Sequence, residues 1–357
     1  MSGKIGVIII DDSAITRSVI ARELAKAGDI EVLATAADAL TARDLIQEKR
    51  PDVITLDLEL PKMDGLTFLR RVIKYMPVPV IVCSSLTPAA CSKAMECLEA
   101  GACEVIGKPK AGAIGDWGPQ LIELIRGAAR AHVERRTPAP PPPTVRPAAP
   151  VLKAPPAPSS IDGRKVIAIG SSTGGTEALR TVLSALPAET PGILMTQHMP
   201  EGFTKPFSER LNGLSRMEVR EACDGDAVRP GLALLAPAGK HLRLSREGMR
   251  YVARVSDGPP VKRHRPSVEV LFESVAQAAG PHAMGIILTG MGDDGADGML
   301  SMFKAGAYTV AQDEASCVVF GMPKAAIQRG GAGHVCPLDQ VANYIASFTS
   351  GAHAHAA

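Results

Sequence analysis

A proline- and alanine-rich stretch at residues 137–160 breaks the chain into two parts. It contains the run Pro140–Pro143 and offers almost no large apolar side chains that a hydrophobic core could use. Such a composition favours an extended, semi-rigid linker with polyproline character. Each flanking part is long enough to build a core of its own. We therefore predict four segments: a domain at residues 1–125, a linker at 126–163, a second domain at 164–348 and a disordered tail at 349–357.

Both flanking parts alternate short apolar runs with helical patterns. The run Val7–Ile10 is rich in β-branched residues, as expected of a strand buried on both faces, and Ser13–Ala27 has the apolar spacing of a helix. Six more apolar runs have the length of strands: Val53–Leu56, Val78–Val82, Glu104–Ile106, Val166–Ile169, Ile193–Thr196 and Ile286–Leu288. This alternation predicts the α/β class, with a doubly wound parallel sheet in the first domain and a mainly parallel sheet in the second. Functional side chains are then expected at the carboxyl ends of the strands.

The charge balance and the apolar runs exclude several classes of protein. The chain has 39 Lys and Arg against 37 Asp and Glu, and a net charge of +2 is too small for non-specific nucleic-acid binding. No apolar stretch approaches the ~20 residues that span a bilayer, and the first one is too short for a signal peptide. Seven cysteines without a C-x-x-C pair predict neither a disulfide framework nor a zinc site. We therefore expect a cytoplasmic protein that has no nucleic-acid partner and does not insert into a membrane.

Carboxylates follow two of the predicted strands of the first domain. Asp11 and Asp12 come directly after Val7–Ile10, and Asp57 comes directly after Val53–Leu56. Carboxylates that meet at one sheet edge repel one another unless a cation joins them, and oxygen ligands of this kind suit Mg²⁺. The sequence therefore predicts a Mg²⁺ site with Asp11, Asp12 and Asp57 as its ligands.

A hydroxyl and an ammonium group complete the predicted pocket. Ser84 follows the third strand and Lys108 follows the fourth. A carboxylate nucleophile, a divalent cation, a hydroxyl and an ammonium together can bind and accept a phosphoryl group. The alternative for any one of these residues is a helix-capping aspartate or an exposed lysine. Five such residues, each at a strand end, favour the phosphoryl site.

These residues resemble the receiver domain of two-component response regulators. The matching words are Asp11-Asp12, Leu56-Asp57-Leu58-Glu59-Leu60-Pro61-Lys62-Met63-Asp64-Gly65, Ser84-Ser85 and Lys108-Pro109. The resemblance implies a flavodoxin-like fold in which Asp57 accepts phosphate from a sensor histidine kinase. It also implies that Lys108 binds a phosphate oxygen and that Ser84 is the hydroxyl switch. Many receivers carry an aromatic switch residue three positions before the lysine, where this chain has Val105. The phosphorylation signal is therefore expected to be transmitted through another surface of the receiver.

A glycine-rich turn opens the second domain. The segment Gly170-Ser171-Ser172-Thr173-Gly174-Gly175 follows a predicted strand and contains G-x-S-x-G centred on Ser172. A strand-to-helix turn of this kind exposes a serine hydroxyl, and amides at the helix N-terminus can stabilise an oxyanion. The turn could instead cradle a phosphate or a dinucleotide, but its glycines do not have the G-x-G-x-x-G spacing. The turn favours a hydrolase over a nucleotide site.

A serine nucleophile needs a base and a group that orients the base. His198 follows the strand-like run Ile193–Thr196 after one residue, and Asp294 lies in a glycine-rich segment after the run Ile286–Leu288. We predict that His198 is the base and that Asp294 accepts a hydrogen bond from its ring. Three other histidines lack this strand-end context: His241, His264 and His282.

Two alternatives are disfavoured by order and spacing. The chain order Ser172, His198, Asp294 differs from the order Ser, Asp, His of the α/β-hydrolases, which argues against that superfamily. A calcium loop starting at Asp293 would need glutamate at its twelfth position, where this chain has Lys304.

The motifs of the second domain resemble the catalytic domain of the CheB family of chemotaxis protein-glutamate methylesterases. The matching words are Ile169-Gly170-Ser171-Ser172-Thr173-Gly174-Gly175-Thr176-Glu177-Ala178-Leu179, Gln197-His198-Met199-Pro200 and Thr289-Gly290-Met291-Gly292-Asp293-Asp294-Gly295-Ala296. The order of receiver, linker and esterase matches the architecture of the whole family. The resemblance implies that Ser172 is the nucleophile, His198 the general base and Asp294 its orienting carboxylate. It also places Thr173 and the Met291 amide beside the triad, at the oxyanion site.

The resemblance also implies a reaction and its partners. The reaction is hydrolysis of glutamate γ-methyl esters on methyl-accepting chemotaxis receptors with release of methanol, and deamidation of receptor glutamines is implied as well. The phosphodonor is the chemotaxis sensor histidine kinase, CheA. Mg²⁺ serves the receiver, and the esterase needs no cofactor. The alternative is a non-enzymatic response regulator whose second domain only binds a partner, and the intact Ser172, His198 and Asp294 count against it.

Overall fold

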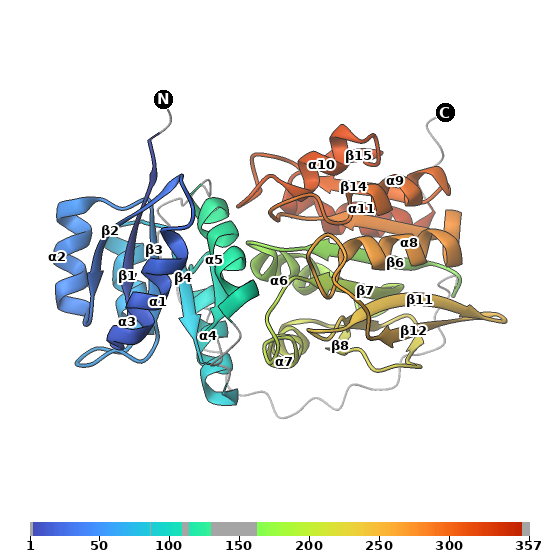
Figure 1. The fold of residues 1–357 in the computed structure, drawn as a ribbon. Coiled ribbons are helices and arrows are strands. Elements are labelled where there is room, and N and C mark those ends of the chain that lie inside the picture. The colour runs from blue at the N-terminus through green and yellow to red at the C-terminus, as the bar shows by residue number, and fades with distance from the viewer. Residues whose placement is uncertain (1–2, 86, 109–113, 130–162, 352–357) are drawn as a thin grey trace. The chain divides into compact units, whose positions relative to one another are not determined.

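The computed structural model describes residues 3–85, 87–108, 114–129 and 163–351. The chain divides into two compact units, Met1–Pro155 and Pro156–Ala357, and each is described by itself (Figure 1). Most of the predicted linker lies outside the described residues, as do residues 352–357 of the predicted tail.

The first unit is built on a five-stranded parallel sheet with the order β2-β1-β3-β4-β5. Its strands are β1 (Ile5–Ile10), β2 (Ile30–Ala36), β3 (Val53–Asp57), β4 (Val80–Ser84) and β5 (Glu104–Gly107). Its described helices are α1 (Ala14–Leu24), α2 (Ala39–Lys49), α3 (Gly65–Tyr75), α4 (Pro88–Glu99) and α5 (Ile114–Ala128). Helix α1 packs against α5, whereas α3 packs against α2 and α4 (Figure 1). This arrangement confirms the predicted doubly wound parallel sheet.

Local sequence signals begin the helices of this unit. Four residues accept a hydrogen bond from a first-turn amide and so cap α1 to α4: Ser13, Asp38, Asp64 and Thr87. The strands β3 and β4 are buried along their whole length, as expected of parallel strands covered on both faces. The core between the sheet, α1 and α5 includes the fully buried Ile9, Leu24 and Leu121.

The second unit has a seven-stranded parallel sheet with the order β15-β14-β13-β6-β7-β10-β8. Its strands are β6 (Val166–Ser171), β7 (Gly192–Gln197), β8 (Glu218–Glu221), β10 (Leu232–Leu235), β13 (Ala283–Ile287), β14 (Tyr308–Gln312) and β15 (His334–Cys336). Its α-helices are α6 (Gly175–Ala185), α7 (Thr204–Leu214), α8 (Val268–Ala279), α9 (Ala296–Lys304), α10 (Met322–Gln328) and α11 (Val341–Ser350). The predicted mainly parallel sheet is confirmed.

A small antiparallel sheet lies beside this parallel sheet. It consists of β9 (Ala227–Val228), β11 (His241–Glu247) and β12 (Arg250–Ser256) in the order β11-β12-β9. Helix α8 packs against β11, β6 and α9 (Figure 1). Its Leu271 and Phe272 are fully buried. The N-terminus of α8 is thereby anchored, and it faces one of the sites described below.

Two helices extend a few residues past the predicted domain boundaries. Helix α5 continues to Ala128, three residues into the predicted linker, because Ile125 and Ala128 are fully buried in the core. Helix α11 includes Thr349 and Ser350, which were predicted to belong to the tail, because the buried Phe348 holds its last turn. Among the described helices, none combines the length and the hydrophobicity needed to cross a membrane.

Candidate functional sites

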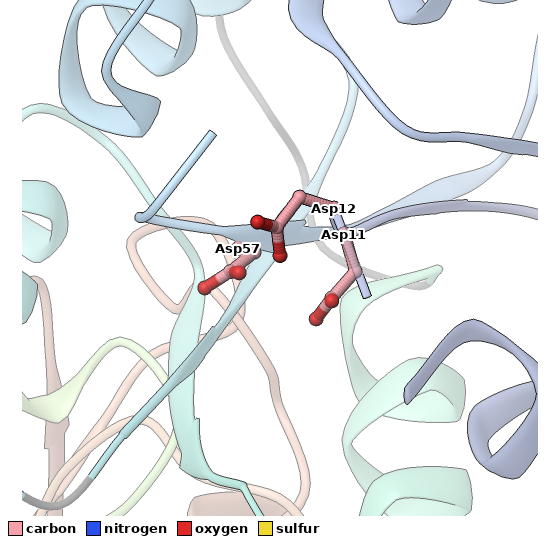
Figure 2. A group of neighbouring side chains, drawn as sticks. All are labelled: Asp11, Asp12 and Asp57. Atoms are coloured by element: carbon pink, nitrogen blue, oxygen red, sulfur yellow. The ribbon is translucent and has the colours of Figure 1, made fainter. Parts of the chain in front are cut away.

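The three predicted carboxylates of the first unit meet at the carboxyl ends of β1 and β3. The parallel pairing of Ile10 with Leu56 sets the next residues, Asp11 and Asp57, side by side. Asp11 and Asp57 are buried and Asp12 is exposed. One oxygen of each carboxylate lies within 4.8 Å of the others (Figure 2). The topology therefore brings together residues that are 46 positions apart in the sequence.

Lys108 joins two of these carboxylates. Its Nζ lies 2.7 Å from Asp57 Oδ2 and 2.8 Å from Asp11 Oδ2. Burial lowers the pKa of Lys108, but the hydrogen bonds to the two carboxylates outweigh burial and raise it. The ammonium group is therefore charged at neutral pH and is placed beside the carboxylate predicted to accept the phosphoryl group.

Ser84 completes the predicted set at the end of β4. Its side chain is buried, its hydroxyl donates to the Ser85 carbonyl at 3.2 Å, and its own carbonyl accepts from the Lys108 amide at 2.7 Å. The structure therefore brings all five predicted residues to one edge of the sheet. Val105, in β5, is buried, so the aromatic switch is replaced by a small core residue.

The chemistry of this acidic cluster fits a Mg²⁺ ion. Magnesium prefers oxygen ligands and commonly binds through one or two carboxylates together with water and phosphate oxygens. Burial and the charge of Asp57 raise the pKa of Asp11, although the hydrogen bond from Lys108 opposes them. A divalent cation would relieve this repulsion. Asp11, Asp12 and Asp57 are therefore the groups that could hold it.

The second site lies where β6, β7 and β13 end. Strand pairing joins Ser171 to Gln197, and the next residues along these two strands are Ser172 and His198. The His198 amide donates to the Ser171 carbonyl at 3.1 Å, and the Ser172 amide donates to the Thr289 carbonyl at 3.0 Å. Ser172 is therefore held between the segment that carries His198 and the segment that follows β13.

The imidazole of His198 is bound to the carboxylate of Asp294. The Nε2 atom of His198 lies 2.8 Å from Asp294 Oδ2. Asp294 also accepts hydrogen bonds at the N-terminus of α8, from the Ser267 hydroxyl at 2.7 Å and the Val268 amide at 2.7 Å. Burial raises the pKa of Asp294, but these hydrogen bonds and the bond to His198 outweigh it and lower the pKa below its usual value. A charged carboxylate in this position fixes the ring of His198 and stabilises its protonated form.

The predicted bond between nucleophile and base is not formed in this structure. Within the described part of the chain, neither the Ser172 hydroxyl nor His198 Nδ1 has a hydrogen-bond partner, and Nδ1 is buried. Because Nε2 is engaged by Asp294, Nδ1 is the ring atom left to accept the proton of Ser172. Such bonds are often long or absent before substrate binds.

Two glycines let the backbone approach Ser172 closely. Gly174 has φ +78°, a left-handed conformation that glycine adopts without strain. A Cβ atom on Gly290 would lie 2.8 Å from the Ser172 Cβ and 2.3 Å from the Met322 sulfur. Gly290 is therefore required by its close approach to Ser172 and Met322, and Gly174 by its backbone conformation.

The candidate oxyanion groups come from the turn after β6 and from the segment that follows β13. The Thr289 hydroxyl donates to the Thr173 carbonyl at 2.9 Å, which joins the turn after β6 to the segment that contains Met291. In the described residues, the backbone N–H groups of Thr173 and Met291 have no hydrogen-bond partner. Both amides are therefore free to donate to a developing oxyanion.

Sequence reasoning missed His264, whose imidazole stacks on His198. The ring centroids are 3.7 Å apart and the planes differ by 9°. His264 lies on the loop before α8, away from every strand end, so no sequence pattern of the sheet could identify it. Asp293, the neighbour of Asp294, instead pairs with Lys262 and Arg329.

A buried glutamate that sequence reasoning also missed lies behind Asp294. The Glu269 amide donates to Asp294 Oδ1 at 3.2 Å, and the Gly295 amide donates to Glu269 Oε2 at 3.1 Å. Burial, together with the charges of Asp297 and Asp294, raises the pKa of Glu269 from 4.5 to about 7. The carboxyl group is therefore partly protonated near neutral pH.

This raised pKa predicts a pH-dependent stability. Between pH 4.5 and about 7, Glu269 is ionised in the unfolded chain but protonated in the folded one, so stability falls as the pH rises through this window. We expect Glu269→Gln to raise the melting temperature relative to wild type at pH 8 and to have little effect below pH 4.5. The exposed Glu209 of α7 offers a control, and Glu209→Gln is expected to show no such pH-dependent gain. A gain for Glu269→Gln that does not grow with pH would contradict this account.

The first unit carries a pocket of the phosphoacceptor type, and the second carries a set of serine, histidine and aspartate. Together they define a class of proteins, the response regulators with an enzymatic output domain. Residues 7–114 match the response regulator receiver domain family, and residues 167–345 match the CheB methylesterase family. The chain therefore belongs to the CheB methylesterase family.

The similarity to known proteins extends over nearly the whole chain. Protein-glutamate methylesterase/protein-glutamine glutaminase 4 of Anaeromyxobacter dehalogenans is 53% identical over 340 residues, which cover 95% of this chain and 93% of the relative. The Salmonella typhimurium protein-glutamate methylesterase/protein-glutamine glutaminase is 49% identical over 354 residues, which cover 98% and 99%. The crystal structure of the Thermotoga maritima CheB methylesterase catalytic domain is 36% identical, covers 51% of this chain and 96% of its own, and gives a TM-score of 0.50.

Proposed function

We propose that this protein is a phosphorylation-controlled protein-glutamate methylesterase. It hydrolyses glutamate γ-methyl esters on methyl-accepting chemotaxis receptors and releases methanol, and it also deamidates receptor glutamines. The names of the full-length relatives support both activities. The observation that carries the proposal is the 2.8 Å hydrogen bond between His198 and Asp294 beside Ser172. Seven free cysteines suit the reducing cytoplasm, where we expect the reaction to occur.

In the proposed mechanism, His198 acts as the general base. Its Nδ1 accepts the proton of the Ser172 hydroxyl as the oxygen attacks the ester carbonyl, while Asp294 stabilises the imidazolium through Nε2. General-base catalysis contributes ~10²–10⁴-fold to such reactions. The amides of Thr173 and Met291 donate to the oxyanion, and each donor of this kind is worth ~10²–10³-fold.

The intermediate then collapses to an acyl-enzyme. His198 returns its proton to the methoxide, and methanol leaves. Water, deprotonated by the same imidazole, attacks the acyl group, and the glutamate carboxylate and the Ser172 hydroxyl are regenerated. With a glutamine side chain, the same steps release ammonia in place of methanol. The leaving group differs, but the roles of the three residues do not.

In the first unit, Asp57 is the proposed phosphoacceptor. The phosphodonor is a chemotaxis sensor histidine kinase, CheA. Bound Mg²⁺ would be held by Asp11, Asp12 and Asp57 and would neutralise charge on the transferring phosphoryl group. Lys108 lies 2.7 Å from Asp57 Oδ2 and would pair with a phosphate oxygen, and Ser84 would supply the hydroxyl switch.

The experiment that tests this function is methanol release from membranes that contain methylated chemoreceptors. We expect wild-type protein to release methanol, and to do so faster after phosphorylation in the presence of Mg²⁺. A protein that binds the membranes but releases no methanol in either state would instead be a response regulator with a binding output.

We further propose that the unphosphorylated receiver lowers the activity of the esterase. A coupling of this kind is typically ~5–150-fold. The fragment of residues 164–357 is therefore expected to release methanol faster than the unphosphorylated full chain by a factor in this range. The Thermotoga maritima catalytic domain was crystallised as a separate domain, which supports the use of a fragment. Equal rates for fragment and full chain would reject inhibition by the receiver.

A further inference from the structure

The imidazole of His264 covers one face of the imidazole of His198. The two centroids are 3.7 Å apart and the planes are inclined by 9°, so the rings are nearly parallel and in van der Waals contact. The edge of His198 is held separately, by the hydrogen bond from Nε2 to Asp294. A single hydrogen bond leaves the ring free to rotate about the line of that bond, whereas a flat partner on one face removes this freedom.

The loop that carries His264 is anchored on both sides of the histidine. Val261 and His264 exchange backbone hydrogen bonds of 3.0 Å and 2.9 Å. The two residues between them, Lys262 and Arg263, have φ of +49° and +70°, so the chain makes a tight turn there. On the other side, the Arg265 carbonyl accepts from the Gly239 amide at 3.2 Å. The backbone on both sides of His264 is therefore held by hydrogen bonds.

The same loop is joined to the segment that carries Asp294. Lys262 Nζ lies 3.0 Å from Asp297 Oδ2 and 3.5 Å from Asp293 Oδ2. Asp293 and Asp297 flank Asp294 in the sequence. The loop that carries His264 is therefore joined by ion pairs to the segment that carries Asp294, and these two segments supply the two ring contacts of His198. The stacking of His264 on His198 and the hydrogen bond from His198 to Asp294 thus depend on two segments that are joined to each other.

The electrostatic surroundings keep His264 neutral. Burial lowers the pKa of His264, and positive charge on the adjacent His198 lowers it further. Arg263 acts in the same direction, whereas Asp294 and Asp293 oppose these effects and are outweighed. His264 therefore contacts His198 as a neutral ring.

We propose that His264 is a positioning residue of the esterase: its ring stacks on His198 and fixes the plane in which Nε2 binds Asp294 and Nδ1 is left to accept the Ser172 proton. This inference rests on the proposed function and adds a fourth side chain to the three residues of the triad. It assigns no proton transfer to His264. A flat, uncharged ring should therefore be able to replace it.

The test compares His264→Ala and His264→Phe in the full chain, with His282→Ala as a control histidine. We expect His264→Ala to lower kcat for methanol release by about 10–100-fold while KM changes little, because a misaligned base slows the chemical step. His264→Phe should retain kcat within about threefold of wild type and leave the acid limb of its pH–rate profile unshifted, since the lost ring was neutral. His282→Ala should match wild type.

A second readout separates positioning from receptor binding. The rate at which a small serine-reactive phosphonate labels Ser172 should fall in His264→Ala and recover in His264→Phe. Labelling of His264→Ala at the wild-type rate, or a His264→Phe variant that folds but is as slow as His264→Ala, would overturn the inference. If wild type itself is not labelled and releases no methanol, the proposed function fails instead.

Discussion

Ser172→Ala is expected to lower the rate of methanol release by ~10⁴-fold or more, to near the uncatalysed background. The alcohol oxygen that would form the acyl-enzyme is lost, and it belongs to the residue that is held between the His198 segment and Thr289. The free amides of Thr173 and Met291 remain, so a small residual activity from oxyanion binding is compatible with the mechanism. Methanol release from methylated receptor membranes measures the effect directly.

The matched control is Ser184→Ala. Ser184 lies on the adjacent helix α6, and its exposed hydroxyl donates only to the Thr181 carbonyl one turn earlier. We expect this variant to keep wild-type activity. Both variants should unfold at the wild-type temperature. If folded Ser172→Ala retained a tenth or more of the activity, a serine nucleophile at this position would be excluded.

Asp57→Asn is expected to abolish phosphate incorporation altogether. The substitution preserves the shape of the side chain but removes the carboxylate that would form the acyl phosphate. It also removes one of the three carboxylates of the predicted Mg²⁺ site and one of the two that pair with Lys108. Transfer of labelled phosphate from the phosphorylated kinase, or from a small acyl phosphate, measures the loss. Removal of Mg²⁺ with EDTA should have the same effect on wild type.

Asp57→Asn should also change how methanol release responds to phosphorylation. The variant should release methanol at the rate of the unphosphorylated chain and should no longer respond to the phosphodonor, which costs the ~5–150-fold activation expected of the coupling. Asp44→Asn is the control, because Asp44 lies on α2 and its side chain is exposed and paired with Arg43. Labelled phosphate on folded Asp57→Asn, at the wild-type amount, would assign the phosphoacceptor to another residue.

Many residues of both sites could be predicted because they follow buried parallel strands. Buried parallel strands are recognisable as short β-branched runs, and their carboxyl ends must lie at one edge of a sheet. Polar residues that follow such runs, such as Asp11, Asp57, Ser172 and His198, are therefore expected to meet. Asp294, seven residues beyond the end of β13, was predicted from the glycine-rich motif that contains it.

Helix ends were harder to predict than strands. The apolar pattern weakens toward the last turn of a helix, and burial by distant residues decides whether that turn forms. Ala128 and Phe348 are buried by the cores of their units, so α5 and α11 continue beyond the predicted boundaries.

Sequence and tertiary structure therefore determine different features of this protein. Periodicity, glycine spacing and residue type were sufficient for the α/β class, the two units and the side chains at the strand ends, because all of these follow from local backbone geometry. The stacking of His264 on His198, the buried Glu269 behind Asp294 and the binding of Nε2 rather than Nδ1 to that aspartate required the folded chain. These features depend on the path of the loop before α8 and on how that helix packs, which are long-range contacts with no periodic trace in the sequence.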